Sequence, residues 1–143
     1  MTAISTAVAA VVAKLQDSPA VSGQIERVRL RPWKASVDTA IVVRPIRSDV
    51  LDPQLLGGGA YAWDTAIAVE CYARASAGTS PDAAVDSLLG AAYARLMADQ
   101  TLGGAVRSIE PVNVSYDFDI DDQATACAVI QFVARSVTAQ NSL

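Results

Sequence analysis

The sequence predicts an α+β fold: a mostly antiparallel sheet of about five strands packed with two helices, in the order α-β-β-β-α-β-β. Three observations support this. Two segments have apolar residues at helical spacing, five have the alternating or continuously apolar pattern of strands, and turn-forming residues separate them. At 143 residues the chain has the length of one domain, and we expect residues 1–143 to form a single α+β domain.

A first helix is expected from about Ala3 to Gln16, where five apolar residues fall on one stripe. These are Ile4, Val8, Val11, Val12 and Leu15. A first strand follows over Gln24–Arg31, since Val28 and Leu30 alternate with three arginines. The almost wholly apolar, β-branched run Thr39–Ile46 predicts a second strand that pairs with the first.

A long loop is expected over Ser48–Ala60, because Pro53 and the triplet Gly57–Gly59 resist regular structure. Loops this long inside compact domains are often functional. A third, central strand is predicted over Ala62–Arg74, with an apolar face and a charged face. The apolar face comprises Trp63, Thr65, Ile67, Val69, Cys71 and Ala73, and the charged face comprises Asp64, Glu70 and Arg74.

A second helix is expected to begin at Ser80, a good N-cap, with Pro81 at the first helical position, and to end near Asp99. Its apolar stripe is Val85, Leu88, Leu89, Ala92, Tyr93 and Leu96. The next strand is predicted from an alternation of Val112, Val114, Tyr116, Phe118 and Ile120 with Asn113, Ser115, Asp117 and Asp119. A turn at Asp121, Asp122 and Gln123 leads into a last long strand over Ala124–Val137.

The composition indicates an unexported protein with apolar surface to spare for partners. Hydrophobic residues make up 52% and charged residues 18%, slightly more apolar than an average soluble domain. The net charge of −4 argues against electrostatic capture of nucleic acid. Cys71 and Cys127, both expected in strands, are too few for a disulfide framework and indicate a reducing compartment. No segment resembles a secretion signal or reaches the ~20 apolar residues of a membrane span.

The candidate chemistry argues against an enzyme. The chain has no histidine, so the commonest general base and metal ligand are missing. The acidic run beginning at Asp117 has Asp122 and Ala128 where a calcium loop needs Gly and Glu, and the triplet Gly57–Gly59 lacks the Gly-Lys-Ser/Thr ending of a phosphate loop. We therefore expect no catalytic residues, no metal site and no cofactor.

The arginines of the first predicted strand are a candidate interface. Arg27, Arg29 and Arg31 would share one strand face, where three guanidinium groups repel one another unless water or carboxylates surround them. In an acidic protein the matching carboxylates can belong to another copy. The alternative, an ordinary solvated face of an edge strand, stays open at this point.

The end of the second helix carries a family resemblance. The segment Ala91-Ala92-Tyr93-Ala94-Arg95-Leu96-Met97-Ala98-Asp99 is followed by Thr101-Leu102-Gly103-Gly104-Ala105-Val106 and then by paired strands with an acidic tip. This arrangement resembles the tail terminator (tail completion) proteins of long-tailed bacteriophages, whose length and element order agree with most of the 143 residues.

The resemblance implies a virion protein, assembled in the host cytoplasm, that forms a ring, usually a homohexamer, at the head-proximal end of the tail. Such a ring stops polymerisation of the tail tube protein and offers the surface that joins the head-tail connector or neck proteins. DNA would pass its channel without specific binding, and no membrane is involved. The family has no catalytic residues.

A ring with head-to-tail contacts needs two complementary patches on each copy. The arginine-bearing strand is expected to provide one patch and the acidic run the other. The second patch comprises Asp117, Asp119, Asp121 and Asp122. The predicted loop, with Leu55, Gly57, Gly58 and Gly59, is expected to reach along the tail tube.

Other functions remain open. A neck (head-tail connector) or tail-tube subunit would also form a ring, and long strands able to build a continuous barrel between copies would favour it. A non-viral module that binds a small ligand would instead have a well-formed pocket and be a stable monomer. An unrecognised enzyme comes last.

Overall fold

The computed structural model describes residues 1–28, 34, 36–51, 59–75, 77–117 and 125–143. In these residues the elements follow the predicted order, which confirms the α+β fold class. They are α1 (Ala3–Gln16), β1 (Ile25–Glu26), β2 (Thr39–Val50), β3 (Ala60–Arg74), α2 (Pro81–Met97), β4 (Ser108–Asp117) and β5 (Thr125–Ala139).

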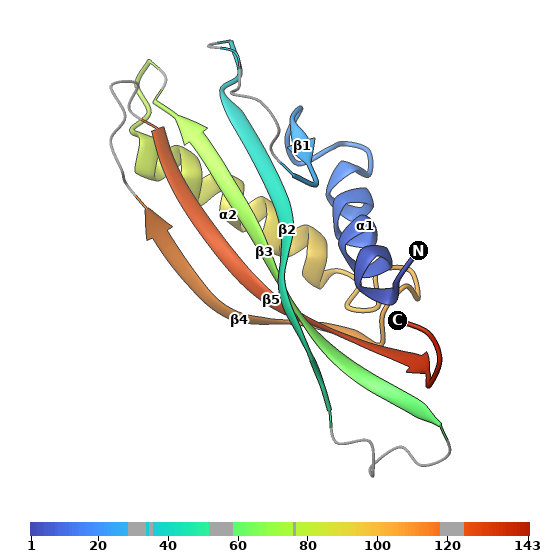
Figure 1. The fold of residues 1–143 in the computed structure, drawn as a ribbon. Helices are drawn as coiled ribbons and strands as arrows, with labels where there is room; N and C mark the ends of the chain where they lie inside the picture. Colours follow the sequence, from blue (N-terminus) through green and yellow to red (C-terminus); the bar gives the residue numbers. More distant parts are fainter. Residues whose placement is uncertain (29–33, 35, 52–58, 76, 118–124) are drawn as a thin grey trace.

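The strands form one mixed, mostly antiparallel sheet in the order β1-β2-β3-β5-β4. Only the short pair β1 and β2 is parallel, and the other three pairings are antiparallel. β3 is the central strand, as predicted, and it pairs along its whole length with β5. Figure 1 shows the two helices together on one face of this twisted sheet, with β2 and β3 running on past them.

The first helix has the predicted limits because both its apolar stripe and its cap agree with them. The Thr2 hydroxyl accepts a hydrogen bond from the Ser5 amide at 3.1 Å, which satisfies one of the free amides of the first turn. The buried side chains are Ala7, Val8, Val11 and Leu15. Val12, expected on the same stripe, is only half-buried.

The second helix begins at Pro81 after Ser80, as predicted, and Asp82 lies in its first turn. Its buried side chains are Val85, Leu88, Leu89, Ala92 and Leu96. Tyr93 departs from the prediction, because it is 42% exposed at the margin of the stripe. Its ring nevertheless stacks on that of Phe132, with centroids 6.5 Å apart.

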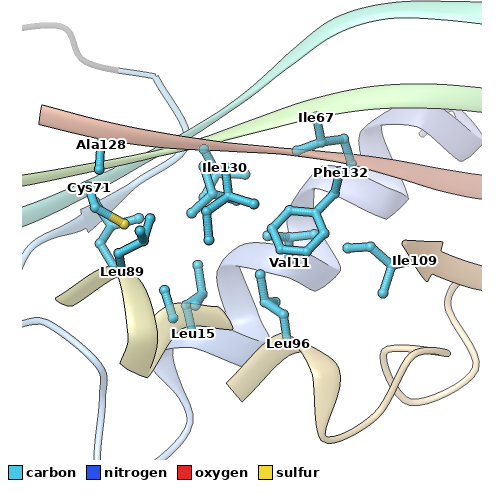
Figure 2. Close-up of a cluster of buried hydrophobic side chains, with 14 of the residues drawn as sticks. Val11, Leu15, Ile67, Cys71, Leu89, Leu96, Ile109, Ala128, Ile130 and Phe132 are labelled. Atoms are coloured by element: carbon cyan, nitrogen blue, oxygen red, sulfur yellow. The ribbon is translucent and has the colours of Figure 1, made fainter. Parts of the chain in front are cut away.

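One hydrophobic core lies between the helices and the sheet (Figure 2). Phe132 of β5 is the largest fully buried side chain, and Ile67 of β3 stands opposite it in the register. Leu15 and Leu96 reach the same cluster from the two helices. Within the described residues, neither helix is long and apolar enough to cross a membrane.

Candidate assembly surfaces

The predicted arginine strand is much shorter than expected. β1 ends at Glu26 because it pairs with β2 at only two positions, and Arg27 already lies in a bend. The Arg27 guanidinium donates a hydrogen bond to the Ser5 hydroxyl of α1 at 2.9 Å. Arg29 and Arg31 lie outside the described residues. The prediction of a strand over Gln24–Arg31 is therefore wrong at Arg27 and Val28, and the interface role of the arginines stays a prediction.

The acidic run lies mostly beyond the part of the chain that the structure describes. Asp117 is exposed, ends β4 and stands opposite Cys127 of β5 in the register. The other members, Asp119, Asp121 and Asp122, together with Phe118 and Ile120 of the predicted strand, are outside the described residues. Their role at an interface also stays a prediction.

The predicted loop is shorter than expected at its first end. β2 continues to Val50, since Ser48, Asp49 and Val50 pair with β3 instead of leaving the sheet. The hydroxyls of Ser48 and Thr65 hydrogen-bond at 2.8 Å across this pair. The prediction that the loop begins at Ser48 is therefore wrong, because this end of the hairpin is regular sheet.

At the second end of the predicted loop, Gly59 has a φ of +86°, a left-handed conformation that glycine adopts without strain. Its carbonyl accepts a hydrogen bond from the amide of Gln140 at 2.7 Å. Leu55, Gly57 and Gly58 lie outside the described residues. Contact of this segment with a tail tube remains a prediction.

Ion pairs cross the face of the sheet that points away from the helices. Arg135 of β5 donates two hydrogen bonds to the Asp64 carboxylate of β3, from Nε at 2.8 Å and from Nη2 at 3.1 Å. Arg44 of β2 donates one hydrogen bond, from Nε, to the Glu70 carboxylate of β3, which also accepts from the Tyr72 hydroxyl at 2.9 Å. The sequence placed Asp64 and Glu70 on this face but did not show their partners. These charges are satisfied within one copy.

The strand β4 exposes apolar side chains along most of its length. Val112 is 54%, Val114 46% and Tyr116 51% exposed. The reason is the lateral order of the strands: β4 is an edge, whereas α2 packs on β3 and β5. The sequence predicted the alternation of these residues but not that they would lie beyond the helices. Exposed apolar residues gathered on one strand are typical of a surface that binds another protein.

The segment that carries the family resemblance begins in the last turns of α2 and ends in a turn that its own side chains stabilise. The Asp99 carboxylate accepts hydrogen bonds from the Thr101 amide and hydroxyl at 3.0 and 2.7 Å, and from the Gly103 amide at 2.7 Å. These bonds lower the pKa of Asp99 below its ordinary value. Leu102, Gly103 and Gly104 follow with φ values of 51°, 71° and 86°. The Asp99 and Thr101 side chains therefore have a structural role in the turn.

Arg95 of the same segment also has a structural role. Its guanidinium donates to the carbonyl oxygens of Asp17 and Pro19, at 2.7 Å in each case. It thereby ties the end of α2 to the end of α1, where helix carbonyls lack partners within the helix. The motif thus fixes how the two helices meet.

A shallow cleft of about 480 Å³ lies where the first turn of α1 meets the last residues of β5. Its lining includes Thr6, Arg107 and Ser136. The Ser136 hydroxyl is buried, and no described residue hydrogen-bonds to it. Among the described residues, no group of three or more Cys, Asp or Glu side chains is placed to hold a metal ion.

The two cysteines are poor nucleophiles. Burial is the main cause that raises the pKa of Cys71 to about 12 and that of Cys127 to about 11. Both thiols are therefore protonated at neutral pH, and they lie in strands as predicted. Burial likewise raises the pKa of Tyr72.

Comparison with known proteins finds matches among solved structures. No protein-family model matches the sequence, and no curated protein matches it. Among solved structures, a chain of the virion of a native gene transfer agent (GTA) particle aligns with 91% of this chain and 93% of its own length. The TM-score is 0.47 and the sequence identity is 17%. Values this low assign neither a family nor a function.

Proposed function

We propose that this chain is a structural subunit of a long-tailed bacteriophage virion, a tail terminator that forms a homohexameric ring on the head-proximal end of the tail tube. The ring stops addition of tail tube protein and offers the surface that binds the head-tail connector or neck proteins. The chain acts by assembly and carries no catalytic group. It is made and assembled in the host cytoplasm, and DNA passes its channel without specific binding.

The observation that supports an assembly role is the exposed apolar side chains on two separate strands. Ile46 of β2 is 46% and Val112 of β4 is 54% exposed, and these strands lie on opposite sides of the sheet centre. Two distinct apolar surfaces on one chain are what a head-to-tail ring requires. The resemblance at Ala91–Val106 supports the terminator among ring-forming proteins.

A neck or tail-tube subunit is the second candidate, and the length of the strands favours it. β3 and β5 have 15 residues each and pair throughout, and β2 has 12. At roughly 3.3 Å per residue, β3 spans about 50 Å. Strands of this length are able to line a continuous barrel shared between copies.

Deletion of the gene from the phage or prophage that carries it tests both candidates. The lysate is imaged by negative-stain electron microscopy, with a strain complemented by the wild-type gene as the control. Full heads beside separate, overlong tubes support a terminator, because loss of a tube-capping protein both lengthens tubes and prevents joining. Tails of normal length that fail to join heads indicate a neck protein, and absent tubes indicate the tube subunit. Normal virions would refute a structural role.

A further inference from the structure

In the part of the chain that the structure describes, the two lateral edges of the sheet are unpaired in the same rows. β1 covers β2 only at Ile41 and Val42, and on the other side the Ile109 amide of β4 donates to the carbonyl of Gln100 at 2.8 Å. Within the described residues, no strand pairs with the outer edge of β2 beyond Val42 or with that of β4 beyond Ile109.

The register across the sheet relates these two edges to each other. Four rows join an open position of β2 to an open position of β4 through β3 and β5. From row to row the end residues are Val43 and Val114, Arg44 and Asn113, Pro45 and Pro111, and Arg47 and Glu110. As far as the described residues go, both edges are therefore unpaired over the same four rows.

Each edge has the same local irregularity in these rows. The register shifts between Pro45 and Arg47 on β2 and between Pro111 and Asn113 on β4. The extra residue is Ile46 on one edge and Val112 on the other, and both are about half exposed. A proline and a bulge interrupt a hydrogen-bonded ladder but leave apolar side chains directed outward.

Charge is complementary in the adjoining row. Arg47 and Glu110 end the row that runs through Ala66 and Val133, so both lie on the face away from the helices. Arg47 pairs with Asp49 of its own strand at 2.9 Å, but this pair is exposed. Exposed ion pairs contribute little to stability, so Arg47 can exchange one carboxylate for another at little cost.

Strand direction fits a head-to-tail arrangement. β2, β3, β5 and β4 alternate in direction, so β4 of one copy would lie antiparallel to β2 of the next copy and the alternation would continue. We propose that Val43–Arg47 of β2 and Glu110–Val114 of β4 are the two halves of a contact between copies of this chain, with Ile46 against Val112 and Arg47 paired with Glu110. This inference rests on the proposed function, which requires a ring.

Two lysine variants test the contact, with a third as the matched control. Ile46→Lys and Val112→Lys each place a charge in one half, and Val137→Lys replaces a similarly exposed valine of β5 that lies outside the four rows. Oligomeric state is measured by light scattering after size-exclusion chromatography, and circular dichroism confirms that each variant is folded. We expect a ring for the wild type and for Val137→Lys, and monomers for each edge variant alone.

Mixing the two edge variants shows whether the contact is head-to-tail. Each variant keeps one intact half, so an equimolar mixture of Ile46→Lys and Val112→Lys should form dimers and stop there. If Ile46→Lys dimerises alone while Val112→Lys does not, the contact is a symmetric one between two copies of β4 and the head-to-tail arrangement is wrong.

A charge exchange tests the row next to the prolines. Arg47→Glu and Glu110→Arg should each weaken self-association at least tenfold, and the double variant should restore it. If the wild type forms a ring and the lysine and charge variants all self-associate within twofold of the wild-type affinity, this contact is wrong but the proposed function still stands. A wild-type chain that stays monomeric overturns ring formation and, with it, the proposed function.

Discussion

Replacement of Phe132 by alanine should remove about 4 kcal/mol from the free energy of unfolding. The ring is fully buried, stands opposite Ile67 and stacks on Tyr93 at 6.5 Å. Phe→Ala substitutions in cores cost about 3–5 kcal/mol, because lost burial and the remaining cavity add together. Out of a total stability of about 5–15 kcal/mol, this is a large fraction.

The loss is measured by urea unfolding followed by circular dichroism, at a protein concentration at which the chain is monomeric. The thermal midpoint should fall by roughly 10 °C or more for a chain of this size. Val133→Ala is the control, because Val133 is the next residue of β5 but is half-buried on the opposite face. It should cost about 1 kcal/mol. Equal losses for the two variants would show that the assignment of the core face is wrong.

Three further predictions follow from side chains described above. Arg95→Ala should cost about 1.5–3 kcal/mol in urea unfolding, because both hydrogen bonds to the end of α1 involve a charged donor, and Arg95→Lys should recover only part of it. Asp99→Asn should lower the thermal midpoint at pH 7. Because folding lowers the pKa of Asp99, its contribution is complete above the unfolded pKa of about 3.9 and disappears as the pH falls through the folded value. The difference between Asp99→Asn and wild type should therefore shrink on acidification, and a constant difference would contradict the turn assignment. Cys71 and Cys127, with pKa values raised to about 12 and 11, should react with a thiol reagent at pH 8 at least tenfold more slowly in the native than in the unfolded protein.

Local patterns were sufficient where a short segment determines its own structure. The helix Ala3–Gln16 has the predicted limits, because a helical stripe and a cap are both encoded within about 16 residues. The start of α2 at Pro81 was predicted for the same reason. Most of the predicted apolar face of β3, from Thr65 to Ala73, is buried as its alternation indicated, whereas Trp63 is half-buried.

Features that depend on distant partners could not be predicted in this way. Alternation of Val28 and Leu30 with arginines favoured a strand to Arg31, but pairing with β2 stops at Glu26. The hairpin of β2 and β3 is longer than expected, because pairing across Asp49 outweighs the polar composition there. Periodicity also does not say which strand is an edge, and the candidate contact depends on that lateral order.

Both edges of the sheet carry a proline and a bulge in the same rows, which has a consequence for how the proposed ring would form. A regular edge is a template on which any extended segment can add, and growth of that kind is hard to reverse. In these rows the backbone of β2 and β4 is irregular and offers no such template. Binding of another copy would therefore depend on the side chains. In the proposed ring, a copy that docks in the wrong place should therefore dissociate easily, so that errors in assembly can be corrected.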